Sequence, residues 1–109
     1  MTKRNQDFEM WIGDHKLLIF TVEDIASIEG TTVKWKMAKS VSREPVIEKS
    51  SNSDLDINNN TFTVQLLPED TINLDTKSDY YHEAELMDEE GNISTLSIGK
   101  VTLHPTLIK

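Results

Sequence analysis

The sequence predicts an all-β protein, an antiparallel sandwich of about seven short strands with one or two short helical turns. Apolar and polar residues alternate in most segments, which is the period of strands. Turn signals rich in Gly, Asn and Asp separate these segments at short intervals. The 109 residues suffice for one core and include no cysteine, so packing rather than disulfides must hold a single domain (1–109) together.

The first predicted element is a hairpin with arms at 8–12 and 16–22 and a turn at 13–15. This register would place Trp11 opposite Leu17. One face would then carry Phe8, Met10, Leu18, Phe20 and Val22, and the other Trp11, Leu17 and Ile19. We assign the first face to the core, because it ends in Val22 whereas the second ends in Thr21.

Residues 23–30 carry Ile25 and Ile28 at helical spacing before a glycine, which predicts one helical turn. The following segment, 33–38, alternates strictly and is predicted to be a strand with its large residues inward. Its tryptophan, Trp35, is the expected centre of the core.

The next segment, 39–60, is polar and contains Pro45 and a run of Ser and Asn, so we expect a long loop. It would hold at most one short strand, near 46–47. Alternation resumes at 62–66, and Pro68 then predicts the first turn of a short helix, where its missing amide costs nothing.

Residues 80–103 predict the second hairpin, around which the other strands pack. Its turn lies at 88–92, where Gly91 can take a positive φ. The inward residues of its first arm are Tyr80, His82, Ala84 and Leu86. Those of its second arm, Leu96, Ile98, Val101 and Leu103, change parity, which predicts a β-bulge at 99–100.

The formal net charge of −8 argues against phosphate backbones or anionic membranes as partners. A basic stretch holds Lys34 and Lys36, but in a sandwich these should lie beside Glu83 and Glu85, which would cancel it. We therefore expect no nucleic-acid binding near physiological salt. We also expect no signal peptide or membrane span, and a flexible segment at 1–6.

No set of residues predicts catalysis, so we expect no enzyme, no cofactor and no metal site. The histidines His15, His82 and His104 lack metal-ligand spacing, and His82 is expected at the core edge, bonded to backbone. Residues 54–60 begin like a calcium loop but lack its glycine and its final glutamate, so a solvated loop is the better interpretation. No nucleophile elbow or phosphate-binding glycine loop is present.

The segment Leu-Leu-Pro-Glu-Asp-Thr (66–71), followed by Asp-Tyr-Tyr-His (79–82), resembles the corner before the sixth strand of immunoglobulin-type sandwiches. The resemblance implies an immunoglobulin-like β-sandwich in which Tyr80 is the tyrosine of that corner. His82 would stand where antibody domains carry a cysteine.

A longer pattern joins LIFTVED (18–24), GTTVKW (30–35), NTFTVQLLPEDT (60–71) and YYHEAELMDEEGN (80–92). It resembles small structural modules of tailed bacteriophages and prophages, such as the N-terminal domain of upper baseplate proteins. This implies a non-enzymatic virion protein of the tail, baseplate, neck or head, made in the host cytoplasm and acting through contacts with itself or with neighbouring virion proteins.

The alternative function is an immunoglobulin-like binding module for a carbohydrate or a cell-surface protein. A sugar platform favours exposed aromatic residues in loops, whereas both tryptophans and both tyrosines lie in predicted strands, which favours assembly. The candidate interface is the apolar face of the first hairpin that cannot enter the core, Trp11, Leu17 and Ile19.

Overall fold

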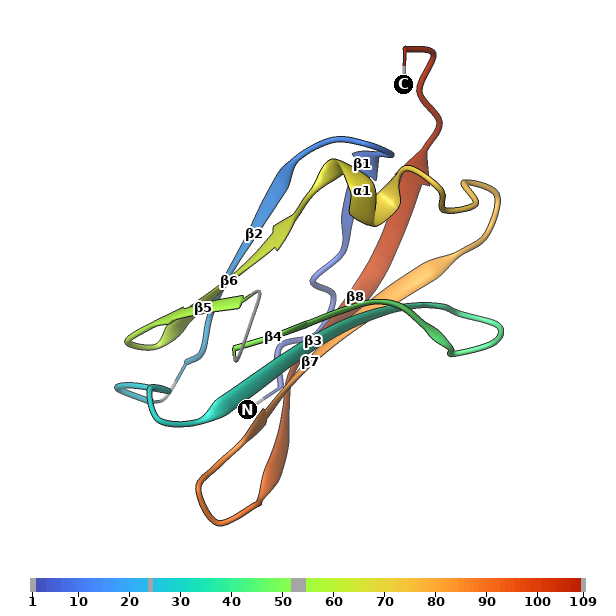
Figure 1. Cartoon of the computed structure of the whole chain (residues 1–109). Helices are drawn as coiled ribbons and strands as arrows, with labels where there is room; N and C mark the ends of the chain where they lie inside the picture. The colour runs from blue at the N-terminus through green and yellow to red at the C-terminus, as the bar shows by residue number, and fades with distance from the viewer. Residues whose placement is uncertain (1, 24, 52–54, 109) are drawn as a thin grey trace.

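A computed structural model describes residues 2–23, 25–51 and 55–108, which form two packed layers of strands (Figure 1). The elements are β1 (Phe8–Trp11), β2 (Lys16–Thr21), β3 (Thr32–Lys39), β4 (Pro45–Ser50), β5 (Leu55–Asn58), β6 (Thr61–Leu66), α1 (Pro68–Thr71), β7 (Tyr80–Met87) and β8 (Ile93–His104). The predicted all-β sandwich is confirmed, with eight described strands where about seven were expected.

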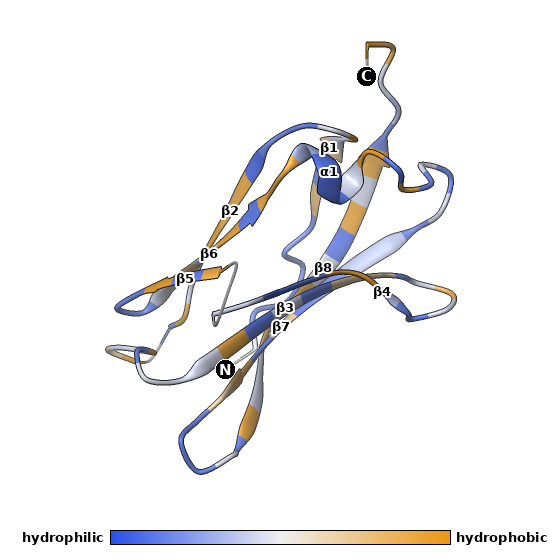
Figure 2. Ribbon diagram, viewed as in Figure 1, coloured by the Kyte–Doolittle hydropathy of each residue, from blue (hydrophilic) through white to orange (hydrophobic). Residues whose placement is uncertain are grey.

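The two sheets differ in size. The larger has the order β1-β8-β7-β3-β4 and the smaller the order β2-β6-β5. Neighbouring strands are antiparallel except β1 and β8, which are parallel. Hydrophobic and hydrophilic bands alternate along β8 (Figure 2), because successive side chains point into and out of the sandwich.

The core lies between the sheets around Trp35, which is fully buried as predicted. Tyr80 and Phe62 are the next largest side chains in it. The predicted corner is also confirmed, because the Tyr80 hydroxyl donates to the carbonyl of Asp75 at 2.7 Å. Burial raises the pKa of Tyr80, so the hydroxyl remains a donor at neutral pH.

The predicted first hairpin is wrong, although the division of its residues into two faces is right. β1 pairs with β8 and β2 pairs with β6, so the chain crosses from one sheet to the other between them. The backbone N–H of Gly13, in this crossing, donates to Thr71 Oγ1 of α1 at 2.8 Å. Met10 and Leu18 are buried because the alternation of side chains along a strand does not depend on its partner.

The expected long loop at 39–60 contains two strands, β4 and β5. The alternation in β4 is disguised because its second inward residue is a lysine. Lys49 is buried and its Nζ lies 2.9 Å from Asp70 Oδ2, which ties β4 to α1. Residues 52–54, between the two strands, lie outside the described residues.

The predicted helical turn at 23–30 does not occur in the described residues of that segment. The N–H of Ile28 donates to the carbonyl of Asn59 at 2.7 Å, so the backbone bonds to a distant turn rather than to itself. Ile28 is fully buried and Ile25 is exposed. The helix predicted at Pro68 is confirmed as α1.

The N-terminal segment was expected to be flexible, but its described residues run along β8. The N–H of Lys3 donates to Leu96 O at 2.8 Å, and that of Gln6 donates to Ile98 O at 3.0 Å. The pairing is possible because β8 begins at Ile93, well before Val101, where the first residue of β1 pairs with it. Met1 lies outside the described residues.

The predicted bulge exists but lies earlier in β8. The register with β7 shifts between Ala84 and Glu85, opposite Leu96, so Leu96 and Ser97 are both buried. Gly99 stands opposite His82 and takes the inward position, where the Gln6 backbone passes over it and leaves no room for a side chain. Since neighbouring side chains of a strand alternate, Ile98 does not join the buried set. The turn glycine, Gly91, has a φ of +87° as predicted.

Candidate interaction surfaces

All three residues of the predicted interface are exposed, but they do not form one patch. The exposed fractions are 48% for Trp11, 52% for Leu17 and 69% for Ile19. Trp11 belongs to the five-stranded sheet, whereas Leu17 and Ile19 belong to the three-stranded sheet. Since the outer faces of two packed sheets point in opposite directions, the structure divides the prediction into two surfaces.

The first surface is the outer face of the three-stranded sheet, which we call the β2 face. Its described residues are Leu17, Ile19, Thr21, Asp56, Asn58, Thr61, Thr63 and Gln65. Only Asp56 among them is charged, and it lies on the far strand β5. Leu17 and Ile19 stand on β2, at the edge of the sheet, opposite Gln65 and Thr63.

The second surface surrounds Trp11, where parallel pairing places His104 beside it. The two ring centroids are 4.6 Å apart with an interplanar angle of 32°. His104 Nε2 lies 3.7 Å from a carboxylate oxygen of Glu9 and has no hydrogen-bond partner in the described structure. No signal in the sequence predicts this cluster, because the partner strand of β1 is not encoded in any local pattern.

The outer face of the five-stranded sheet is charged. Lys34 pairs in register with Glu85, and Lys36 with Glu83, as the sequence predicted. On its other side Lys36 forms an ion pair with Glu48 at 3.3 Å, and both side chains are about half exposed or more. Acidic residues therefore flank the basic strand on both sides. That this arrangement abolishes nucleic-acid binding stays a prediction.

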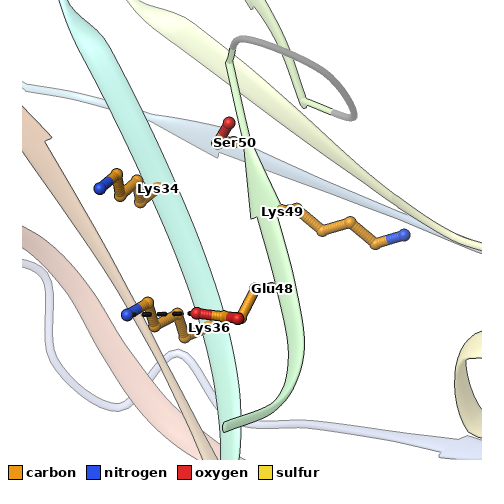
Figure 3. Close-up of a pocket in the computed structure, with 5 residues that line it drawn as sticks. All are labelled: Lys34, Lys36, Glu48, Lys49 and Ser50. Atoms are coloured by element: carbon orange, nitrogen blue, oxygen red, sulfur yellow. Dashed lines mark ion pairs between the residues drawn. The ribbon is translucent and has the colours of Figure 1, made fainter.

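A depression of about 290 Å³ lies over β3 and β4 (Figure 3). It is lined by Lys34, Lys36, Glu48, Lys49 and Ser50. Figure 3 shows Lys49 pointing away from Lys34 and Lys36, toward the other side of the strand. The polar groups thus do not converge on one point, as those of a small-molecule site do.

A polar network centred on His82 lies in the interior. Trp35 Nε1–H donates to His82 Nδ1 at 3.1 Å, and His82 Nε2 bonds to the carbonyl of Gln6. Because an indole N–H can only donate, Nδ1 must accept and the proton of the neutral ring must be on Nε2. The predicted bond from His82 to backbone is confirmed, although the ring is fully buried rather than at the core edge.

Burial lowers the pKa of His82, against smaller opposing effects of the Gln6 carbonyl and the Asp7 charge. The ring of Phe20 lies 5.9 Å from that of His82. A neutral, hydrogen-bonded histidine therefore occupies the centre of the core beside the tryptophan.

Within the described part of the chain, no three His, Cys, Asp or Glu side chains gather as metal ligands. The segment compared with a calcium loop forms β5 over Leu55–Asn58, so a solvated loop is wrong for those residues. Asp54 lies outside the described residues. None of the helices in the described ranges is long and apolar enough to span a membrane.

The comparisons with known proteins establish the fold. No family model matches the sequence, and no curated protein sequence matches it. Among solved structures, the chain is similar to the immunoglobulin-like domain of mouse leukocyte-associated immunoglobulin-like receptor 1, crystallised as a strand-swapped dimer. The TM-score is 0.53 at 9% identity, over 92% of this chain and 90% of that one. The chain has an immunoglobulin-like fold.

Proposed function

We propose that this protein is a non-enzymatic structural subunit of a phage or prophage virion and works through protein–protein contacts. The sequence pattern at 18–24, 30–35, 60–71 and 80–92, which resembles phage structural modules, supports the viral part of the proposal. The location would then be the assembled tail, baseplate, neck or head.

The observation that carries the assembly part is the β2 face. It exposes 52% of Leu17 and 69% of Ile19 on an edge strand whose outward neighbours are uncharged. Adjacent exposed aliphatic residues in such surroundings are typical of protein interfaces. The other large face of the sandwich carries an alternation of Lys and Glu, which favours contact with water.

The test is to separate virus particles made by the host on a density gradient and to probe the fractions for this protein with an antibody. We expect the protein to sediment with infectious particles. We expect Leu17→Ser with Ile19→Ser to reduce its incorporation, whereas Ile93→Ser, which alters an equally exposed isoleucine elsewhere, should not. Absence of the parent protein from purified particles would contradict the proposal.

A second candidate is an immunoglobulin-like binding module for a carbohydrate or a cell-surface protein. The observation that favours it is Trp11, which is half exposed and packs at a tilt against the His104 ring, beside the Glu9 carboxylate. An aromatic ring and a hydrogen-bonding acceptor are the groups that hold a sugar ring. Since Trp35 is fully buried, a change of tryptophan fluorescence on adding glycans would report on Trp11. No change across a glycan panel would argue against the sugar.

A further inference from the structure

Among the described strands four lie at sheet edges, and three of them carry features that discourage pairing with another chain. β1 and β5 have four residues each. β4 begins at Pro45, and its register with β3 shifts between Met37 and Ala38. Shortness, proline and irregular register are the usual protections of an edge. β2 has six residues, contains no proline and pairs with β6 in unbroken register, so it is the least protected edge.

The backbone of β2 has hydrogen-bonding groups directed away from its sheet. The N–H of Val22 donates to Asn60 O at 2.8 Å, and antiparallel bonds alternate along a strand. The even-numbered residues of β2 therefore bond to β6, while the N–H and C=O groups of Leu17 and Ile19 point to the open edge. In the described residues, β2 has no strand partner besides β6.

The occupant that fits this edge is β2 of a second copy. Antiparallel pairing about a two-fold axis near Leu18 places Leu17 opposite Ile19 of the second copy, and the reverse. Both positions carry the open backbone groups, so one register forms the hydrogen bonds and the aliphatic pairs together. Shifting this register by one residue would place the outward side chains of one strand opposite the inward side chains of the other.

Charge selects the same edge. Two copies with a formal net charge of −8 repel each other, so they approach best where the local surface is uncharged. The β2 face meets this condition, because the one charge among its described residues, Asp56, lies two strands away from the edge. Lys16, at the start of β2, has its Nζ over the ring of Phe8, 5.9 Å from the centroid. The charged outer face of the larger sheet does not.

We propose that two copies pair their β2 strands antiparallel and form one continuous six-stranded sheet with the order β5-β6-β2-β2-β6-β5. The inference rests on the proposed assembly function and names a second copy as the partner. Two six-residue strands bury much less than a standard interface, so we expect a dissociation constant on the order of 100 μM for the free protein. Within a particle, additional contacts would strengthen the pairing.

The experiment uses the intact chain, from about 10 μM to about 1 mM around the expected dissociation constant. Sedimentation equilibrium reports the dimer, and amide hydrogen exchange by NMR reports the edge. We expect dimers to increase with concentration and the amides of Leu17 and Ile19 to become protected in parallel. Stacking through the outer face alone would leave these amides exchanging rapidly, so protection separates edge pairing from face packing.

In the proposed register, the variant Ile19→Lys places a positive charge opposite the aliphatic Leu17 of the second copy. It should increase the dissociation constant of the dimer about tenfold or more. Its side chain faces solvent, so the fold should persist, and circular dichroism checks this. Ile93→Lys, at a position on β8 with 62% exposure, is the matched control and should leave the dimer unchanged.

A parent protein that stays monomeric at the highest concentration would overturn the proposal, and so would a dimer whose Leu17 and Ile19 amides remain unprotected. Equal weakening by both lysine variants would overturn it as well. The exchange measurement is made on the parent, so it decides the question even if Ile19→Lys fails to fold. The proposed virion function fails separately, if the protein is absent from purified particles whatever its oligomeric state.

Discussion

The two faces of the β3–β7 pair hold polar groups in opposite circumstances. On the inner face, Trp35 donates to His82 where neither residue is exposed. On the outer face, one residue further along each strand, Lys36 stands opposite Glu83 in water. A buried donor that loses its acceptor finds no water to replace it, whereas an exposed charge does. The neutral network should therefore contribute more to stability than the charged one.

The largest effect should come from filling the space beside the inner network, with Gly99→Ala. The added Cβ would overlap the Gln6 carbonyl oxygen and lie 2.8 Å from His82 Nε2. The backbone of the N-terminal segment must move, and the His82–Gln6 bond breaks with it. We expect a loss of about 3 kcal/mol in the free energy of unfolding, measured by urea denaturation.

Gly91→Ala is the matched control, because nothing lies within 4 Å of its added Cβ. Its φ of +87° makes alanine strained, at a cost of about 1 kcal/mol. If the two alanine variants lose equal stability, the close approach of Gln6 to Gly99 is not a significant constraint.

The next effect concerns the Trp35–His82 bond itself. His82→Phe keeps an aromatic ring but leaves the indole N–H and the Gln6 carbonyl without their partner, and should cost about 2 kcal/mol. Combining it with Trp35→Phe in a double-mutant cycle isolates the bond from the packing of either ring. We expect a coupling energy of about 1 kcal/mol or more, and a value near zero would contradict the assigned network.

The inner network should also make stability depend on pH. Burial lowers the pKa of His82 below its usual 6.5, so the unfolded chain binds the proton more readily. Stability is then complete above about pH 6.5 and falls as the pH decreases toward the lowered value. The slope is positive in this interval and is at most about 1.4 kcal/mol per pH unit, the limit set by one proton.

Urea denaturation between pH 7 and pH 5.5 checks this slope, which should be positive for the parent and absent in His82→Phe. Hydrogen bonds from Ser78 lower the pKa of Asp75, and those from Asn92 lower the pKa of Asp88, below 3.8. Their contribution is lost only at more acidic pH, outside this range. An equal slope in the parent and the variant would assign the effect to another group.

These two faces also show what the sequence could predict. Strict alternation made Trp35 and His82 inward and Lys34 and Lys36 outward, and the register with Glu83 and Glu85 followed from the fold. The corner at Tyr80 was readable because it is built from a short local segment.

Long-range pairing was not readable in the same way. The exposure of Trp11, Leu17 and Ile19 was predicted correctly. Their division between two sheets, however, depends on the pairing of β1 with β8, two strands more than 80 residues apart in the sequence, in which Phe8 lies beside Val101. A local pattern records which side chains point together and not which strand lies beside them. β4 was predicted only as a short strand near 46–47. Its full length was not readable for another reason, since its inward Lys49 has its partner, Asp70, on α1.

The smallest effect should come from the outer face, measured by the same kind of cycle as the inner bond. Lys36→Met with Glu48→Gln removes an ion pair of 3.3 Å whose side chains are 49% and 63% exposed. We expect a coupling energy of about 0.2–1 kcal/mol that decreases in roughly 0.5 M salt, because salt screens exposed charges. The Trp35–His82 coupling, between uncharged and buried groups, should not change with salt. If the outer coupling equals or exceeds the inner one, burial does not decide the contribution of polar pairs in this sheet, and the difference between its two faces is one of chemistry alone.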